Sequence, residues 1–223
     1  MATDRDFLDY MMSFLSERRQ DLFNQVLAER TRHITVLVEE LYQPHNTNAV
    51  LRSCECFGIQ DVHVIEDVNE FDISRRISMG SHKWLDIHKY NNTEDGIASL
   101  KKKGYTVVAT CLSDEAIAPE EYDISVPTAF LFGTEKTGLS KTALNAADVH
   151  MKIPMRGFTE SFNISVSAAL ILYHFTKTLR SSKAKWSLAE NEKDELKIKW
   201  LQEHLKAFDK MKEYYYEEIE NKT

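Results

Sequence analysis

Short apolar runs alternate with helical patterns through the middle of the chain. The runs are rich in β-branched residues, are bounded by polar residues and cover 34–38, 62–65, 105–111, 128–132 and 149–153. Runs of this length predict strands that are buried on both faces of a sheet. Between them, apolar spacing predicts helices over 48–57, 93–103, 140–146 and 161–180. Strands that alternate with helices indicate an α/β domain with a mainly parallel sheet flanked by helices.

Both ends of the chain carry only helical patterns. Residues 3–6 resemble a capping box, and the apolar residues that follow predict a helix or a helix pair through about Glu29. A second capping box at 187–190 precedes apolar residues that recur every three or four positions. This pattern predicts one long amphipathic helix that packs on its own domain or contacts another subunit or RNA. We therefore expect helical extensions over 1–30 and 181–223 around a central domain over 31–180.

The composition narrows the class of protein. Hydrophobic residues make up 43% of the 223 residues and Gly and Pro are sparse, which excludes a disordered or collagen-like chain. Three widely split cysteines favour reduced thiols and a cytoplasmic location over a disulfide scaffold. We expect no membrane span and no secretion signal, because no apolar run approaches about 20 residues. The net charge of -7 argues against nonspecific coating of nucleic acid but permits a local basic site.

Three polar clusters follow predicted strands, where an α/β sheet usually binds its ligand. The first, over 43–58, starts a helix with Asn46 and places Arg52 two turns later. An Arg on an otherwise apolar helix needs an anionic partner, which is either a buried Glu or a ligand. None of the seven glycines forms a GxGxxG or P-loop spacing, which argues against an ordinary dinucleotide or NTPase site.

The other two clusters surround a turn and a helix start. The second, over 131–140, is bracketed by glycines, whose backbone can approach a ligand closely, and its Glu135 can accept hydrogen bonds. The third, over 153–165, leads into an apolar helix that starts near Ser161 and Asn163. These two residues are either plain caps or part of a site for an anion such as phosphate. The scattered His and Cys residues lack metal-ligand spacing, so we expect no metal.

Together the clusters resemble the three motifs of the SpoU (TrmH-type) branch of the SPOUT RNA 2'-O-methyltransferases. The shared features are an Asn with an Arg six positions later, the Phe-Gly-x-Glu-x-x-Gly turn, and the run from Ile-Pro-Met to Glu-Ser-Phe-Asn-Ile-Ser-Val-Ser-Ala-Ala. Their order and spacing extend the resemblance over about 31–180. The segments 30–39 and 44–46, and Arg76 with 80–84, resemble the tRNA branch that methylates the D-loop guanosine at position 18.

The resemblance implies a fold and a cofactor. The carboxyl-terminal part of the domain, roughly 128–180, would thread through a loop as a deep trefoil knot. In this family S-adenosylmethionine (AdoMet) is the methyl donor and lies in the knot, and the protein is a homodimer. By motif position, the cofactor would contact Thr110, Leu112, Leu131, Phe132, Gly133, Ile153, Met155 and Phe162.

The resemblance also implies catalytic roles. The arginine that matches Arg52 activates the ribose 2'-hydroxyl, with Asn46 arranging the site and Glu135 supporting it. Ser161 and Asn163 would lie near an RNA phosphate and the cofactor. Because the pKa of a free Arg is above about 12, Arg52 either accepts the proton or stabilises the developing alkoxide while an RNA phosphate accepts it. We expect RNA contacts from basic residues of both subunits: Arg18, Arg19, Arg30, Arg32, His45, Arg75, Arg76 and Lys83.

The expected function is AdoMet-dependent 2'-O-methylation of the D-loop guanosine at position 18 of tRNA. Alternative substrates are a tRNA wobble nucleotide and a 23S rRNA guanosine. The helical ends favour tRNA, because the family's wobble enzymes tend to be minimal domains and its ribosomal enzymes commonly carry a separate RNA-binding domain. A noncatalytic RNA-binding relative is the alternative from another class, and the complete set of motif residues argues against it.

Overall fold

A computed structural model describes residues 5–39, 44–66, 80–135 and 137–220. The chain divides into a helical unit, formed by Met1–Arg30 with Ser187–Thr223, and an α/β unit over Thr31–Trp186. The two ends, which the sequence pattern predicts as separate extensions, therefore belong to one compact unit.

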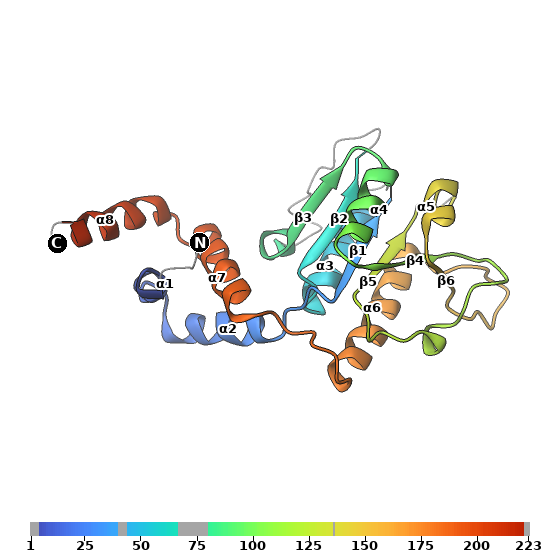
Figure 1. Cartoon of the computed structure of the whole chain (residues 1–223), viewed down its shortest axis with the longest axis horizontal. Helices are drawn as coiled ribbons and strands as arrows, with labels where there is room; N and C mark the ends of the chain where they lie inside the picture. The colour runs from blue at the N-terminus through green and yellow to red at the C-terminus, as the bar shows by residue number, and fades with distance from the viewer. Residues whose placement is uncertain (1–4, 40–43, 67–79, 136, 221–223) are drawn as a thin grey trace. The chain divides into compact units, whose positions relative to one another are not determined.

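The α/β unit contains a parallel sheet whose described strands follow the order β3-β2-β1-β5-β4-β6 (Figure 1). The strands are β1 (Ile34–Val38), β2 (Asp61–Ile65), β3 (Asp86–Tyr90), β4 (Thr106–Thr110), β5 (Thr128–Phe132) and β6 (Val149–Met151). Every residue of β1, β2 and β5 is buried, because helices cover both faces of these central strands. The predicted α/β class with a parallel sheet is confirmed.

The edge strand β3 is the strand that the apolar pattern does not predict. Its sequence, Asp-Ile-His-Lys-Tyr, is largely polar, and none of its residues is fully buried. A strand at the edge of a sheet pairs on one side only and tolerates polar side chains. A search for apolar runs therefore does not identify β3 as a strand.

Helices cover both faces of this sheet. They are α3 (Pro44–Cys56), α4 (Thr93–Lys102), α5 (Lys141–Ala146) and α6 (Ile164–Ser181), with short 3-10 helices η1 (Ser81–Trp84) and η2 (Pro119–Glu121) in the connections. α3 and α6 pack side by side on one face, where Leu51 and Phe175 join the core. α4 and α5 cover the other face with Ile97, Leu100 and Ala143. None of the helices in the described part of the chain has the length and apolar content that a membrane span requires.

The helical unit consists of α1 (Arg5–Met12), α2 (Glu17–Ala28), α7 (Glu190–His204) and α8 (Phe208–Glu220). α1 and α2 form the predicted helix pair, although Thr3 of its capping box lies outside the described residues. The prediction of one long tail helix is wrong, because the chain turns between α7 and α8. This turn lets Phe208 and Tyr216 pack against Phe7, with ring centroids 6.2 and 5.6 Å away. α7 also begins later than its predicted capping box, and the Ala189 N–H donates to Glu192 Oε2 at 2.9 Å.

Candidate active site

A cavity of about 780 Å³ lies at the carboxyl ends of β4, β5 and β6. Its wall consists of the segment after β4, the loop after β5, the segment after β6, part of α5 and one side of α6. In a parallel sheet with helices on both faces, ligands bind at this edge. The volume suits a ligand of nucleoside size.

Seven of the eight residues predicted to contact the cofactor line this cavity: Thr110, Leu112, Phe132, Gly133, Ile153, Met155 and Phe162. The eighth, Leu131, lies apart from the wall. Successive side chains of a strand point to opposite faces of the sheet, so Leu131 is buried in the core under α4 and α5. Its carbonyl oxygen accepts a hydrogen bond from Thr110 Oγ1 of the neighbouring strand β4 at 2.7 Å.

Motif matching misses the cavity residues that α5 and α6 contribute. They are Leu144, Asn145, Ile164, Ser167 and Ile171. On α6 the lining residues Ile164, Ser167 and Ile171 recur every three or four positions, so they share one face of the helix. Helical periodicity is therefore the signal that could have identified them.

Two glycines determine the shape of the loop after β5. A Cβ on Gly133 would lie 2.1 Å from the carbonyl carbon of Gly138, so no side chain fits there. Gly138 has a φ of 69°, a left-handed conformation that favours glycine. Two backbone hydrogen bonds of 2.9 and 3.0 Å join Thr134 and Gly138 across the loop. The glycine-bracketed turn predicted from the sequence is thus a closed loop on the cavity wall.

Glu135 connects two of the other predicted catalytic residues. Its carboxylate accepts hydrogen bonds from Asn46 Nδ2 at 3.3 Å and from Asn163 Nδ2 at 3.0 Å. Asn163 also caps α6, because its Oδ1 accepts from the Ser165 N–H at 2.9 Å. The start of α3, the loop after β5 and the start of α6 therefore meet at one carboxylate, and Ser161 lines the cavity beside it.

Arg52 lies on α3 with an exposed side chain. The alternative of a buried Arg52–Glu ion pair is therefore wrong. Within a single chain the residue is not part of the cavity wall. Its exposure leaves the guanidinium accessible to a polyanionic ligand or to a second subunit.

Known proteins resemble this chain in sequence. A family model described as SpoU rRNA Methylase family matches residues 33–173. This chain belongs to that family. A tRNA (guanosine(18)-2'-O)-methyltransferase from Borreliella burgdorferi is 38% identical over 198 residues, which cover 89% of this chain and 91% of the relative. The resemblance predicted from the three motifs is confirmed.

Solved structures of SpoU proteins share the fold. The A. aeolicus TrmH/SpoU tRNA modifying enzyme matches with a TM-score of 0.75 and 31% identity, over 85% of this chain and 98% of that one. The SpoU methyltransferase AviRb from Streptomyces viridochromogenes, solved in complex with AdoMet, matches with a TM-score of 0.62 and 23% identity, over 71% of this chain and 65% of that one.

Three of the arginines predicted to contact RNA have structural partners in this SpoU family member. Arg19 Nη2 lies 3.5 Å from His204 Nδ1, and its guanidinium lies over the Phe23 ring at 5.6 Å. Arg30 is fully buried, and its guanidinium lies over the Trp200 ring at 5.2 Å. The side chain therefore makes a cation–π contact within the helical unit and not the predicted RNA contact. Arg18 and Lys83 are exposed. Arg75, Arg76 and the side chain of His45 lie outside the described residues.

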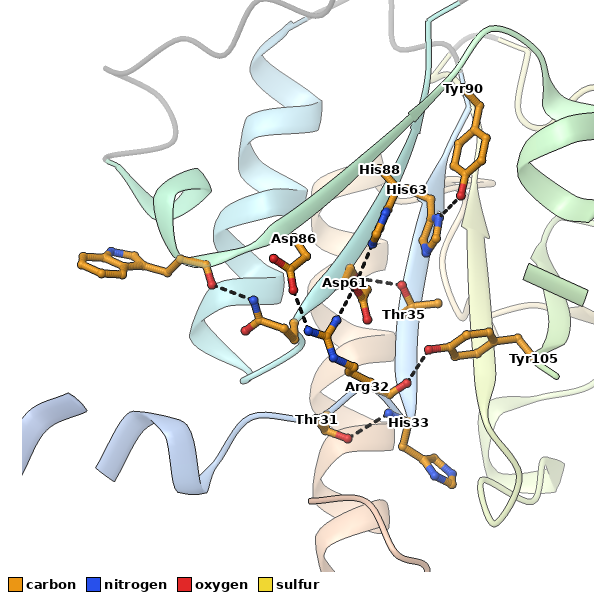
Figure 2. A network of polar contacts seen from close by, with 12 residues as sticks. Thr31, Arg32, His33, Thr35, Asp61, His63, Asp86, His88, Tyr90 and Tyr105 are labelled. Carbon is orange, nitrogen blue, oxygen red and sulfur yellow. Dashed lines mark hydrogen bonds and ion pairs between the residues drawn. The ribbon is translucent and has the colours of Figure 1, made fainter. Parts of the chain in front are cut away.

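Arg32 belongs to a polar network that begins at the amino ends of β1, β2 and β3, opposite the cavity (Figure 2). It donates to Asp61 at 2.6 Å and to Asp86 at 2.7 Å, and His88 contacts the same Asp61 at 2.8 Å. Burial alone would raise the pKa of Asp61, but the hydrogen bond from His88 and the charge of Arg32 lower it to about 2. Arg32 thus forms ion pairs that connect neighbouring strands, and its RNA contact stays a prediction.

Proposed function

We propose that this protein transfers the methyl group of AdoMet to the 2'-hydroxyl of a tRNA ribose, namely that of the guanosine at position 18. One observation carries the proposal. Glu135 on the wall of the cavity accepts hydrogen bonds from Asn46 and Asn163, in a chain that is 38% identical to a relative named for this activity. The three free cysteines fit the reducing cytoplasm, where we expect the protein to act on tRNA.

The cavity fits AdoMet by its shape and chemistry. Apolar side chains such as Phe132, Ile153 and Ile171 can contact the adenine, while backbone groups at the strand ends can bond the polar atoms of the nucleoside. The close approach of Gly133 to Gly138 keeps side chains out of the loop's centre and leaves its backbone available. AdoMet supplies an electrophilic methyl group when bound. The described His, Cys, Asp and Glu side chains form no group of three that could hold a metal ion.

We assign the predicted catalytic residues distinct roles in the methyl transfer. Arg52 is charged at neutral pH, so we assign it to stabilising the oxygen anion that develops on the ribose, with an RNA phosphate accepting the proton. Asn46 and Glu135 hold the two helix starts in place. Ser161 and Asn163 lie at the amino end of the 18-residue helix α6, whose dipole and free N–H groups favour an RNA phosphate.

We propose that a second copy of the chain completes the protein as a homodimer. Val166, Leu170 and Tyr173 share one face of α6 and expose between 42% and 55% of their surface, while the opposite face packs on the sheet. A stripe of this kind on a structured helix is typical of a protein interface. Sedimentation analysis should show a dimer for the wild type and a monomer for Leu170→Glu. Val126→Glu, at an apolar residue outside α6 that is 45% exposed, should remain dimeric.

We further propose that roughly 128–180 forms the deep trefoil knot. The segment after β4 pairs with the chain around β6, since Ile117 N–H donates to His150 O and Lys152 N–H donates to Ile117 O, both at 2.9 Å. β6 thus lies between β4 and this segment, as threading through the loop after β4 requires. An experimental chain trace in which 152–163 passes outside that loop would contradict the knot.

The test of the activity is methyl transfer from labelled AdoMet to unmodified tRNA, with ribosomal RNA in parallel and mapping of the modified nucleotide. Label on the D-loop guanosine is the expected result. Label at the wobble position or in ribosomal RNA would support the proposed methyl transfer and contradict the proposed substrate. AdoMet binding without transfer to any RNA would favour a noncatalytic RNA-binding protein.

A further inference from the structure

A buried carboxylate, Glu39, lies directly after β1 and beside the cavity loop. The residue is only 5% exposed. Its carboxylate accepts hydrogen bonds from Thr93 Oγ1 at 2.6 Å, from the Ser140 N–H at 2.6 Å and from Ser140 Oγ. These donors come from the first turn of α4 and from the cap of α5. Three donors satisfy a charge that would otherwise be costly to bury.

Glu39 binds both ends of the loop that lines the cavity. Its backbone N–H donates to the carbonyl oxygen of Phe132, the last residue of β5, at 2.8 Å. Its carboxylate holds Ser140, the residue that follows the loop. The residues between these two anchors include Gly133, Glu135 and Gly138 on the cavity wall. One residue outside the cavity wall thus fixes where the loop starts and where it ends.

The Ser140 anchor also sets the position of α5. Ser140 Oγ accepts a hydrogen bond from the Ala143 N–H at 3.0 Å and thereby caps this short helix. Leu144 and Asn145 of α5 line the cavity. Loss of the anchor would therefore loosen two parts of the cavity wall together, namely the loop and α5.

We propose that Glu39 is a positioning residue that holds the described loop residues 133–135 and 137–139 in their cofactor-binding shape. The inference rests on the proposed function. Because the loop is held before the cofactor arrives, binding does not have to supply the free energy of ordering it. A loop that is released populates other shapes, and the apparent Kd for AdoMet rises in proportion to the lost population of the binding shape. The chemical step, at saturating AdoMet, should change much less.

Glu39→Gln tests this role with a small change in shape. An amide has one oxygen where the carboxylate has two, so it cannot accept from Thr93 Oγ1, Ser140 Oγ and the Ser140 N–H as the carboxylate does. Thr93→Val is the matched control, because it removes one hydrogen bond from the same carboxylate and leaves both loop anchors in place. Both variants should lower the melting temperature by similar amounts.

The experiment measures the Kd for AdoMet by calorimetry on the full-length proteins, with the melting temperature and the tRNA methylation kinetics of each. We expect Glu39→Gln to raise the Kd about tenfold and Thr93→Val to change it less than about twofold, while kcat at saturating AdoMet stays within about threefold for both. Equal Kd changes in the two variants, or a wild-type Kd in Glu39→Gln, would show that Glu39 only stabilises the fold and does not position the loop.

A second variant keeps the inference testable if Glu39→Gln does not fold. Ser140→Ala retains the N–H bond to Glu39 and loses only the hydroxyl contacts, so we expect a smaller rise of the Kd, about threefold. An unchanged Kd in Ser140→Ala would then overturn the role of Glu39. Absence of AdoMet binding by the wild type is a different outcome, because it would overturn the proposed function itself.

Discussion

His63 is expected to make the folded α/β unit sensitive to acid. The imidazole is fully buried in β2, stacks on His88 with ring centroids 4.6 Å apart, and contacts the Tyr90 hydroxyl through Nδ1 at 2.9 Å (Figure 2). Burial and, secondly, the nearby His88 lower the pKa of His63 from 6.5 to about 3. The folded protein therefore keeps His63 neutral at pH values at which the unfolded chain protonates it.

The sign and size of the effect follow from proton linkage. A group whose pKa is lower in the folded than in the unfolded state reduces stability as the pH falls below the unfolded value. The extra proton bound by the unfolded imidazole rises from about a quarter at about pH 7 to nearly one at about pH 5, which lowers the free energy of unfolding by about 2 kcal/mol over this range. Asp61 does not contribute in this range, because its usual pKa of 3.8 and its folded value of about 2 both lie lower.

Urea unfolding at about pH 7 and about pH 5, followed by tryptophan fluorescence, measures this difference. His63→Asn keeps a polar group near Tyr90 but does not titrate, so it should be less stable at neutral pH and lose about 2 kcal/mol less than the wild type on acidification. An equal loss in the wild type and in His63→Asn would show that another group controls acid sensitivity.

Three further predictions concern the site and the helical unit. Arg52→Ala should lower kcat at least about hundredfold while the calorimetric Kd for AdoMet stays within about twofold, and normal turnover would exclude its catalytic role. Gly133→Ala would place a methyl group 2.1 Å from backbone atoms and should abolish AdoMet binding, whereas Gly157→Ala, with open space around it, should bind like the wild type. Deletion of residues 187–223 removes Trp200 from the core of the helical unit, so α1 and α2 should unfold while AdoMet still binds. An unchanged helical circular dichroism signal per residue would contradict this prediction.

The sheet could largely be predicted from local patterns, and the exceptions have physical causes. β1 and β5 are apolar at nearly every position because both faces are covered, and such runs can be read without knowing their neighbours. The turn between α7 and α8 could not be predicted in this way. The apolar spacing continues unchanged through Leu205 and Phe208, and the chain turns because Phe208 contacts Phe7, some 200 residues earlier.

Site residues that belong to a sequence motif could be predicted. Contacts between side chains far apart in the sequence could not. Asn46, Glu135 and Asn163 are marked by their motifs, although their hydrogen bonds are visible only in three dimensions. Arg30 shows the opposite case. Its charge near other basic residues favours RNA contact, but Trp200 covers it from the other end of the chain.

The two buried carboxylates next to β1 explain why burial alone does not reveal a role. Asp61 lies at the amino edge of the sheet, and its partners Arg32 and His88 are charged or titratable groups that join neighbouring strands. Glu39 lies at the carboxyl edge, and its partners are neutral donors that fix a loop and two helix starts. Loss of the first carboxylate should therefore weaken the sheet and leave the Kd for AdoMet unchanged in the folded protein. Loss of the second should change the Kd, because the groups that it holds form the wall of the cavity.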